Sequence, residues 1–379
     1  MVAQSTRQYR VAKGDSLADE LFNRDTVGWL AAHFADDFDV EGFVTVVMAD
    51  LPARALKARI NHIADVLARF LPPDFKAAAQ VIEAALPPPL DPQRCDNDFG
   101  HFIYAPLGVY VENHGLRTDF SHSLALLEQI TQRFSMEFSV RAFLNHNQDA
   151  ALAYIRRWAT HENYHVRRLA SEGTRPRLPW GQNVGLAIAD TLPILDELHS
   201  DPTRFVTRSV ANHLNDIAKT NPDAVIDRLE IWQGAGRQTA KELDWMRRHA
   251  LRGLMKAGHP RAMLHLGYQP DVKIADATIG IPTKVSRGEK VEVSVSFTPL
   301  QDGPLMVDYV IDHMKSNGKT APKTFKFKGL SGKGDIAVSL AKIHHFNAQA
   351  STFRLYRGAH QIHLQVNGRI IASQDFHLS

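Results

Sequence analysis

The sequence predicts an all-α repeat solenoid followed by an all-β sandwich. Apolar residues recur at three- and four-residue spacing as far as about residue 270, which is typical of amphipathic helices. After Pro270 the chain changes to short alternating runs rich in Val, Ile, Phe and Thr. Because helices and strands do not alternate along the chain, we assign them to separate domains, 1–269 and 270–379.

The helical pattern is clearest in three segments. Residues 31–51 and 56–71 carry apolar side chains at helical spacing, and the pattern resumes in 122–144. Between them, 86–92 contains four prolines in seven residues, which excludes a helix interior there. We expect this stretch to be a stiff connection.

A register of 40 residues repeats within the helical region. It relates Arg168, Arg208 and Arg248. Two apolar positions keep the same register, the first at Val166, Val206 and Met246 and the second at Ala170, Val210 and Ala250. An Asp-Ala pair also stands at the same distance before Trp158 and before Trp232, and Asn221-Pro222 is a typical helix start. A period near 40 with two helices per unit indicates HEAT-like stacking, in which the apolar positions pack and cap.

The β region reads as an immunoglobulin-like sandwich. Asn367-Gly368, between two alternating runs, is a signal for a type I′ hairpin. Six or seven strands in about 105 residues fit such a sandwich. The predicted strands are 291–300, 305–312, 323–330, 351–358, 360–368 and 369–378.

Composition narrows the class of protein. The chain is 44% hydrophobic and 22% charged, as ordinary globular proteins are, and no apolar run approaches the ~20 residues that a membrane span needs. The first 15 residues have no apolar core of a secretory signal. Cys95 is the single cysteine, which excludes an intrachain disulfide and a Cys-rich metal site. We expect a cytoplasmic monomer without a membrane partner.

Charge is distributed unevenly although the net charge is only +3. Residues 1–129 hold 11 Lys and Arg against 18 Asp and Glu, whereas 130–179 hold 8 Arg against 4 acidic residues. Residues 271–379 hold 14 basic against 9 acidic residues. An acidic start followed by basic segments is compatible with a polyanionic partner for the later part of the chain, and equally with chance variation.

Residues 161–165 spell the zinc-protease string His-Glu-x-x-His. On one helix, His161 and His165 would share a face and could bind zinc, with Glu162 as the base. The third ligand of the extended motif is absent, and Asn163 resembles a break between two helices. We therefore expect no metal site here.

The segment from His165 to Trp180 is rich in charged and aromatic side chains that could take part in binding or catalysis. Arg168 and Glu172 stand at i and i+4 on a helix predicted to end at Gly173, so they share a face. Two arginines on a proline-constrained loop and Trp180 follow. An acid, a large aromatic and several arginines on one edge suit a phosphodiester with a charged base nearby, whereas a surface ion pair and a core tryptophan are the alternative.

Three stretches resemble the AlkC-type bacterial DNA alkylation repair glycosylases, relatives of AlkD in the HEAT-like glycosylase superfamily. They are HVRRLASEGTRPRLPW at 165–180, RFSMEFSVR at 133–141 and SVANHLNDIAK at 209–219. The segment 38–43 is also similar, so the resemblance covers about 15–270. Members occur with and without a C-terminal immunoglobulin-like domain, and the strands after 270 are typical of the longer form.

This resemblance implies hydrolysis of the N-glycosidic bond of cationic bases, such as 3-methyladenine or 3-methylcytosine, in duplex DNA for base excision repair. It implies Glu172, Glu137 and Asp216 as carboxylates near the lesion, with Trp180 packing against the sugar or the base. Asp216 could instead cap its helix or pair with Lys219. The arginines expected to hold phosphates are Arg168, Arg175, Arg177 and Arg208.

No cofactor is expected, because a cationic base is already a good leaving group.

Lys326, Lys328 and Lys333 form the most visible basic patch of the C-terminal domain. They could contact DNA, or they could lie on the solvent-exposed face of a strand. Three rivals stay open: a non-catalytic HEAT scaffold that binds damaged DNA or a protein, a metalloprotease, and a structural DNA-bending protein.

Overall fold

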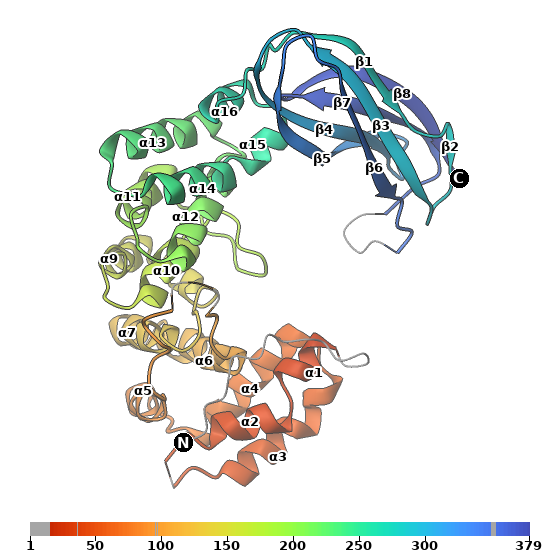
Figure 1. The fold of residues 1–379 in the computed structure, drawn as a ribbon. Helices are drawn as coiled ribbons and strands as arrows, with labels where there is room; N and C mark the ends of the chain where they lie inside the picture. The colour runs from red at the N-terminus through yellow and green to blue at the C-terminus, as the bar shows by residue number, and fades with distance from the viewer. Residues whose placement is uncertain (1–15, 36, 95, 97, 350–353) are drawn as a thin grey trace. The chain divides into compact units, whose positions relative to one another are not determined.

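The computed structural model describes residues 16–35, 37–94, 96, 98–349 and 354–379 (Figure 1). Contacts divide the chain into two compact units, which do not coincide with the division into helices and strands. The first unit comprises Met1–Ile217 and Ala235–Met246, and the second comprises Ala218–Gly234 and Arg247–Ser379. The last helical segments therefore pack with the β-sheets, while strands begin at Ile274.

The first unit consists of short helices joined by turns, several of which have capping side chains. Its N-terminal part contains α1 Leu17–Leu21, α2 Arg24–Ala31, α3 Val40–Asp50, η1 Leu51–Ala53, α4 Leu56–Phe70, α5 Phe75–Ala84, η2 Phe102–Tyr104 and α6 Ala105–Gly115. It continues with α7 Phe120–Thr131, α8 Val140–His146, α9 Gln148–Trp158, α10 Tyr164–Glu172, α11 Ile188–Leu198 and α12 Arg204–Ile217. Among the described residues, no helix has the length and apolar character needed to cross a bilayer.

Two more helices lie wholly in the second unit, and two are divided between the units. The helices wholly in the second unit are α15 Arg252–Lys256 and α16 Pro260–His265. The divided helices are α13 Pro222–Ala235, of which only the last residue belongs to the first unit, and α14 Ala240–Ala250.

The segment predicted at 56–71 is α4, but the other two helical segments are interrupted. In 31–51, α2 ends at Ala31 and α3 begins only at Val40, after Asp39 accepts a hydrogen bond from the backbone of Gly42. In 122–144, a turn over 132–139 separates α7 from α8, and the Thr131 hydroxyl accepts the backbone N–H of Met136 there. In both segments the helical spacing of apolar residues therefore continues through a break that separates two helices.

The 40-residue register corresponds to repeated helices. Three of the repeated apolar residues are fully buried, namely Val166 on α10, Val206 on α12 and Met246 on α14. Trp158, the last residue of α9, and Trp232, within α13, are both 1% exposed. These repeated apolar positions are packing positions, as the pattern predicted. Proline at the first position of α13 follows Asn221, whose side chain accepts the N–H of Ala224 at 3.1 Å.

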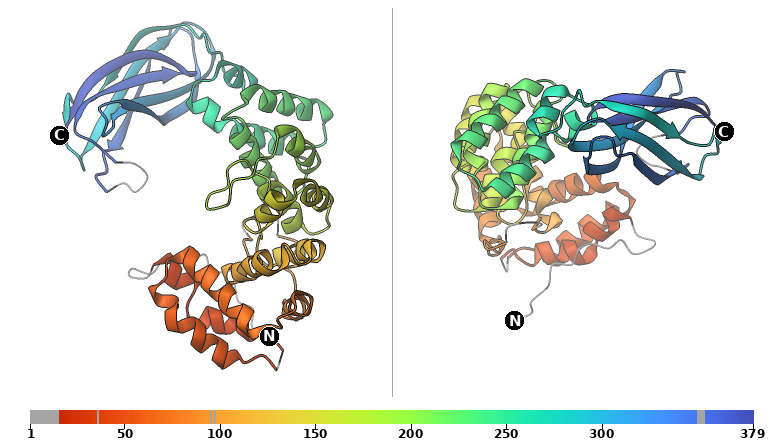
Figure 2. Two further views of the ribbon diagram at one scale, coloured as in Figure 1. Left: turned by 180° about the vertical axis from the view of Figure 1, so that it is seen from behind. Right: turned by 45° about the horizontal axis from the view of Figure 1, so that its top comes forward.

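The second unit contains two β-sheets that face each other, and nearly all of their strand pairs are antiparallel (Figure 2). One has the strand order β1-β3-β6 and the other β2-β8-β7-β4-β5. Alternate residues of β3 are buried, and they pack with the inward side chains of β4 and β7. The strands are β1 Ile274–Gly280, β2 Lys284–Val285, β3 Lys290–Pro299, β4 Gly303–Met314, β5 Thr320–Gly332, β6 Val338–His345, β7 Gly358–Val366 and β8 Arg369–Leu378.

Five of the six predicted strands correspond to observed ones. The prediction for 351–358 is wrong at 354–357, which form no strand, and 351–353 lie outside the described residues. β1, β2 and β6 were not predicted; in β6 the buried position is His344, which interrupts the apolar alternation of the sequence. Asn367 and Gly368 form the β7–β8 turn with φ of 45° and 82°, as a type I′ turn requires.

The β7–β8 turn is packed against the end of α15. Asn367 is 1% exposed, and its amide donates to the carbonyls of Gln269 and Pro304 at 2.9 and 3.2 Å. A Cβ on Gly368 would lie 2.5 Å from the Cα of Gly258. This close approach of two backbones leaves no space for a side chain on Gly368.

We expect Gly368→Ala to lower the free energy of unfolding by about 2–4 kcal/mol, because it adds a clash to an unfavourable positive φ. Gly267→Ala is the matched control, since Gly267 has a φ of 85° with nothing within 4 Å of its added Cβ. Chemical denaturation of both variants measures the difference. Equal losses in the two variants would contradict the close approach.

Candidate functional site

A row of alternating charges connects α10, the loop that follows it, α12 and the turn before α8 in the first unit. Glu137 Oε2 lies 2.7 Å from Arg168 Nη1, and Arg168 Nη2 lies 3.7 Å from Glu172 Oε2. Arg175 continues the row, with Nη1 at 2.5 Å from Glu172 Oε1 and Nη2 at 2.8 Å from Asp216 Oδ2. The charge row, as we call these five residues, thus holds three carboxylates and two guanidiniums.

The local structure explains how the five side chains meet. α10 begins at Asn163, whose side chain accepts the N–H of His165, and presents Arg168 and Glu172 one turn apart. The helix ends after Glu172, so Arg175 extends from the following loop. Asp216 comes from the last turn of α12, and Glu137 from the turn between α7 and α8. Ser135 donates to Glu137 at 2.9 Å within that turn.

The centre of the charge row is withdrawn from water. Glu172 is 4% exposed and Asp216 5% exposed. Burial alone would raise the pKa of Glu172, but Arg168, Arg175 and the hydroxyl of Ser209 at 2.5 Å stabilise the carboxylate, and its pKa is lowered. Glu172 is therefore a firmly ionised carboxylate and could not serve as a proton donor at neutral pH.

Buried neutral histidine lies beside the charge row. His213 is fully buried, and burial lowers its pKa to about 4. One ring nitrogen lies 3.1 Å from the carbonyl of Ser171, in the last turn of α10. An uncharged ring here leaves the balance of charge to the carboxylates and arginines.

Trp180 stands apart from the charge row on the loop that follows α10. It is 63% exposed, which excludes the alternative of a core tryptophan. Its φ of 68° is a left-handed conformation that costs a bulky residue about 1–2 kcal/mol. The surrounding contacts must hold this conformation in place.

Arg141 supplies those contacts. Its side chain is fully buried, and it donates to the carbonyls of Gly173 and Arg175, both at 2.9 Å, and to that of Gln182. Lys57 adds a hydrogen bond of 3.4 Å to the carbonyl of Trp180. One guanidinium from α8 therefore fastens both ends of the loop that carries Trp180.

The predicted site residues fall into two groups. The structure brings Glu137, Glu172 and Asp216 together with Arg168 and Arg175, so those two guanidiniums are engaged by carboxylates. Arg177 is exposed and has no hydrogen-bond or ion-pair partner within the described ranges, while Arg208 pairs with Asp96 from the connection before η2.

Sequence reasoning gave no role to Arg141, Ser135 and Ser209. Arg141 and Ser135 lie in the stretch 133–141, and Ser209 opens the stretch 209–219, both of which carried the family resemblance. The partners of Arg141 are 32–41 residues away in sequence, and local patterns do not reveal such contacts.

The His-Glu-x-x-His string does not form a zinc site. His161 and Glu162 precede α10, and the cap at Asn163 separates them from His165. His161 lies 3.5 Å from Glu128 instead. In the described part of the chain, no three His, Cys, Asp or Glu side chains are grouped to hold a metal ion.

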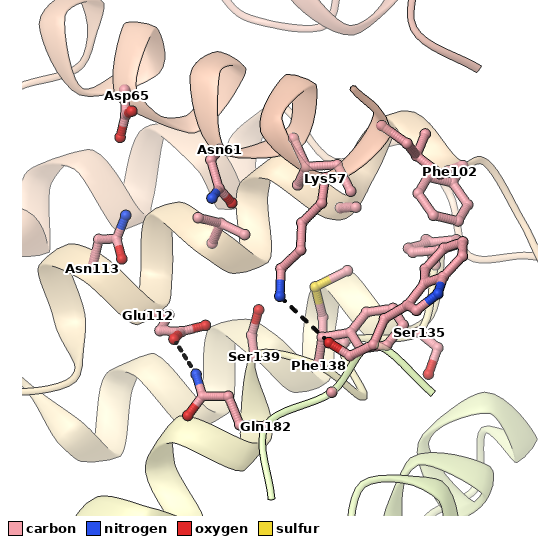
Figure 3. A pocket seen from close by; sticks show the side chains of 18 residues that line it. Lys57, Asn61, Asp65, Phe102, Glu112, Asn113, Ser135, Phe138, Ser139 and Gln182 are labelled. Carbon is pink, nitrogen blue, oxygen red and sulfur yellow. Dashed lines mark hydrogen bonds between the residues drawn. The ribbon is translucent and has the colours of Figure 1, made fainter. Parts of the chain in front are cut away.

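A cleft of about 360 Å³ adjoins the charge row (Figure 3). α4 and α6 form its two sides, Phe102 and the 134–139 turn form its floor, and residues 180–182 form its rim. Ser135 connects the cleft to the charge row, since it lines the cleft and donates to Glu137.

Two family models match this chain. The model described as DNA alkylation repair enzyme matches residues 124–254, which contain the whole charge row. The model described as the C-terminal Ig-like domain of the uncharacterised protein YhaZ matches residues 275–379.

Two proteins resemble the chain over nearly its full length. The uncharacterized protein YhaZ of Bacillus subtilis is 32% identical over 371 residues, which are 94% of this chain and 98% of that protein. The structure of the Pseudomonas fluorescens alkylpurine DNA glycosylase AlkC, bound to DNA containing an abasic site analog, matches with a TM-score of 0.83. It is 32% identical, and the match covers 96% of this chain and 99% of that one.

We expect Arg141→Lys to loosen the Trp180 loop, because one ammonium cannot replace a planar fork that reaches three carbonyls. Unpaired buried carbonyls should lower the free energy of unfolding by about 2–4 kcal/mol. Amide hydrogen exchange over 173–182 should become faster than in an Arg117→Lys control, which changes an exposed arginine on the protein surface. Unchanged exchange in that loop would contradict the role of Arg141.

Proposed function

Since this chain belongs to the AlkC-type family of DNA alkylation repair glycosylases, we propose that it hydrolyses the N-glycosidic bond of cationic alkylated bases in duplex DNA. Methylated adenine and cytosine at N3 are the substrates that fit this chemistry. The observation that carries the proposal is the buried charge row, in which three carboxylates meet within the segment matched as DNA alkylation repair enzyme.

The chemistry needs little acid catalysis. A base that carries a positive charge leaves as a neutral molecule when the bond pair of the N-glycosidic bond goes with it. The positive charge then passes to the sugar, which becomes oxocarbenium-like, and water attacks the anomeric carbon and loses a proton. A protein accelerates this reaction by placing negative charge beside the sugar and by positioning the water.

The charge row provides such a fixed negative field. Its three carboxylates exceed its two guanidiniums by one, so it has a net charge of −1. The low pKa of Glu172 keeps that charge present at neutral pH. We assign Glu172 and Glu137 to stabilisation of the cationic sugar and base, and Asp216 to the same field from α12.

The arginines divide into two roles. Arg168 and Arg175 lie between carboxylates, and a DNA phosphate would have to share them; we assign them to holding the carboxylates in place. Arg177 is exposed on the loop of Trp180 and suits a phosphate contact. Arg208 would exchange Asp96 for a phosphate. The exposed indole of Trp180 would pack against the deoxyribose or the lesion.

The C-terminal sheets offer basic side chains to the DNA backbone. Lys326 and Lys328 lie on β5, at the edge of the five-stranded sheet. Lys333 contributes less, because its ammonium lies 2.7 Å from Asp302. We propose Lys326 and Lys328 as phosphate contacts that enlarge the DNA footprint of a monomeric enzyme.

A non-catalytic scaffold for damaged DNA is the second candidate. A scaffold would require the same DNA-binding surface, but it would not need a buried, ionised carboxylate. Burying Glu172 costs free energy of folding, and a catalytic role gives a reason for that cost. The separation of His161 from His165 by a helix cap argues against a metalloprotease.

We expect Glu172→Gln to slow single-turnover excision of 3-methyladenine from duplex DNA by about 10²- to 10³-fold, because it removes charge but keeps shape. Trp180→Ala should slow it as well. High-performance liquid chromatography of the released base, in the presence of EDTA, measures the rate.

Glu162→Gln is the matched control, since Glu162 is exposed directly before the same helix. It should retain the wild-type rate. Full excision rates in Glu172→Gln and Trp180→Ala proteins that bind DNA and unfold cooperatively would defeat the site assignment.

We expect Lys326→Ser/Lys328→Ser to weaken DNA binding and to lower the slope of log affinity against log salt concentration by about 1–2, because each phosphate contact releases about one counterion. Lys284→Ser is the control, since it lies on β2 at the opposite edge of the same sheet. Fluorescence anisotropy at several salt concentrations measures both. An unchanged slope in the double variant would exclude these contacts.

A further inference from the structure

The cleft beside the charge row has a lining unlike that of a phosphate site. Its ionisable side chains are Lys57, Asp65 and Glu112, which give a net charge of −1 when all are ionised. The one ammonium is directed to the carbonyl of Trp180 at 3.4 Å. A phosphate entering the cleft would meet two carboxyl groups, so the lining selects against nucleotides and the DNA backbone.

The polar groups of the cleft suit the edge of a heterocycle. Asn61 and Asp65 project from α4, and Glu112 and Asn113 project from α6 toward the same space (Figure 3). The side chains of Asn61, Asp65 and Asn113 have no hydrogen-bond or ion-pair partner in the part of the chain that the structure describes. Amides carry both donors and acceptors, which is what the mixed edge of a nucleobase requires.

One carboxyl group of the cleft is held in a fixed position. Gln182 donates from Nε2 to Glu112 Oε1 at 2.8 Å, which joins α6 to the rim that carries Trp180 (Figure 3). Burial raises the pKa of Glu112 above its ordinary value. One wall of the cleft is therefore tied to its rim by a hydrogen bond, while Asn61, Asp65 and Asn113 are exposed to an entering ligand.

The remaining lining is apolar and aromatic. Phe102 and Phe138 contribute ring surface, Ile60 and Val109 contribute aliphatic surface, and the exposed indole of Trp180 lines the rim. Aromatic surface beside a few fixed polar groups is typical of sites for flat heterocycles. A volume of about 360 Å³ lies at the lower end of the range for small-molecule sites.

We propose that this cleft binds the nucleobase released by excision, a neutral methylated purine without its sugar phosphate. The released base fits because it carries no phosphate to oppose Asp65 and Glu112, and because Ser135 connects the cleft directly to Glu137. The identity of the occupant as reaction product rests on the proposed glycosylase function. Recognition of a purine base by the cleft does not depend on that function.

The test measures binding of free 3-methyladenine to the full-length protein by ligand-observed nuclear magnetic resonance, with adenosine 5′-monophosphate as the phosphate-bearing comparison. We expect a dissociation constant of about 0.1–10 mM for the base, as is usual for a ligand of this size. The monophosphate should bind at least about tenfold more weakly, because its charge meets the carboxyl groups.

Asn61→Leu/Asn113→Leu keeps the size of both side chains and removes their hydrogen bonds, and it should weaken base binding by about tenfold or more. Gln80→Leu is the matched control, since it changes an exposed amide on α5 outside the cleft. In excision assays, added 3-methyladenine should slow the wild-type protein more than the double variant.

The outcomes of these measurements distinguish a site for the free base from a site for a base still attached to DNA. No binding of free base up to about 10 mM, or equal binding by wild type and the double variant, would overturn the proposal. Loss of duplex affinity in the double variant without binding of free base would assign the cleft to a base still attached to DNA, and would also overturn it. Base binding by a protein without excision activity would keep the nucleobase site and defeat the glycosylase function instead.

Discussion

A carboxylate can be buried inside a helical repeat only if a cation accompanies it, and the charge row follows from this constraint. Glu172 is almost fully enclosed, and desolvation of a lone carboxylate there would cost several kcal/mol. Arg168 and Arg175 offset that cost by pairing with Glu172 from either side. Each arginine also pairs with a second carboxylate, Arg168 with Glu137 and Arg175 with Asp216. The five side chains consequently fix the relative positions of α10, α12 and the turn before α8.

This arrangement explains why the site can act without a mobile acid. The negative charge is held by ion pairs and by Ser209, so its position does not depend on substrate binding. The Trp180 loop is fastened by a different buried cation, Arg141, which donates hydrogen bonds to three backbone carbonyls. In the proposed function the scaffold thus separates two tasks: the charge row supplies the negative field, and Arg141 holds the exposed Trp180 loop that we propose to contact DNA.

Much of this organisation could be predicted from local sequence. The break at Asn163, the end of α10 before Gly173 and the i, i+4 pair of Arg168 and Glu172 are local features, and the structure confirms all three. The sequence pattern failed where apolar periodicity continued through a break, which concealed the turn that carries Glu137. The contacts of Arg141 and of Asp96 with Arg208 could not be predicted, because they join residues far apart in the chain.

The most direct test of the central claim is the release of bases from methylated genomic DNA by the wild-type protein with EDTA present. If the charge row stabilises a cationic sugar, methylated purines should appear in the supernatant at a rate proportional to enzyme concentration, and unmodified bases should not. A folded protein that binds methylated DNA but releases no base would contradict the account, and would make the charge row a structural element of a damage-binding scaffold.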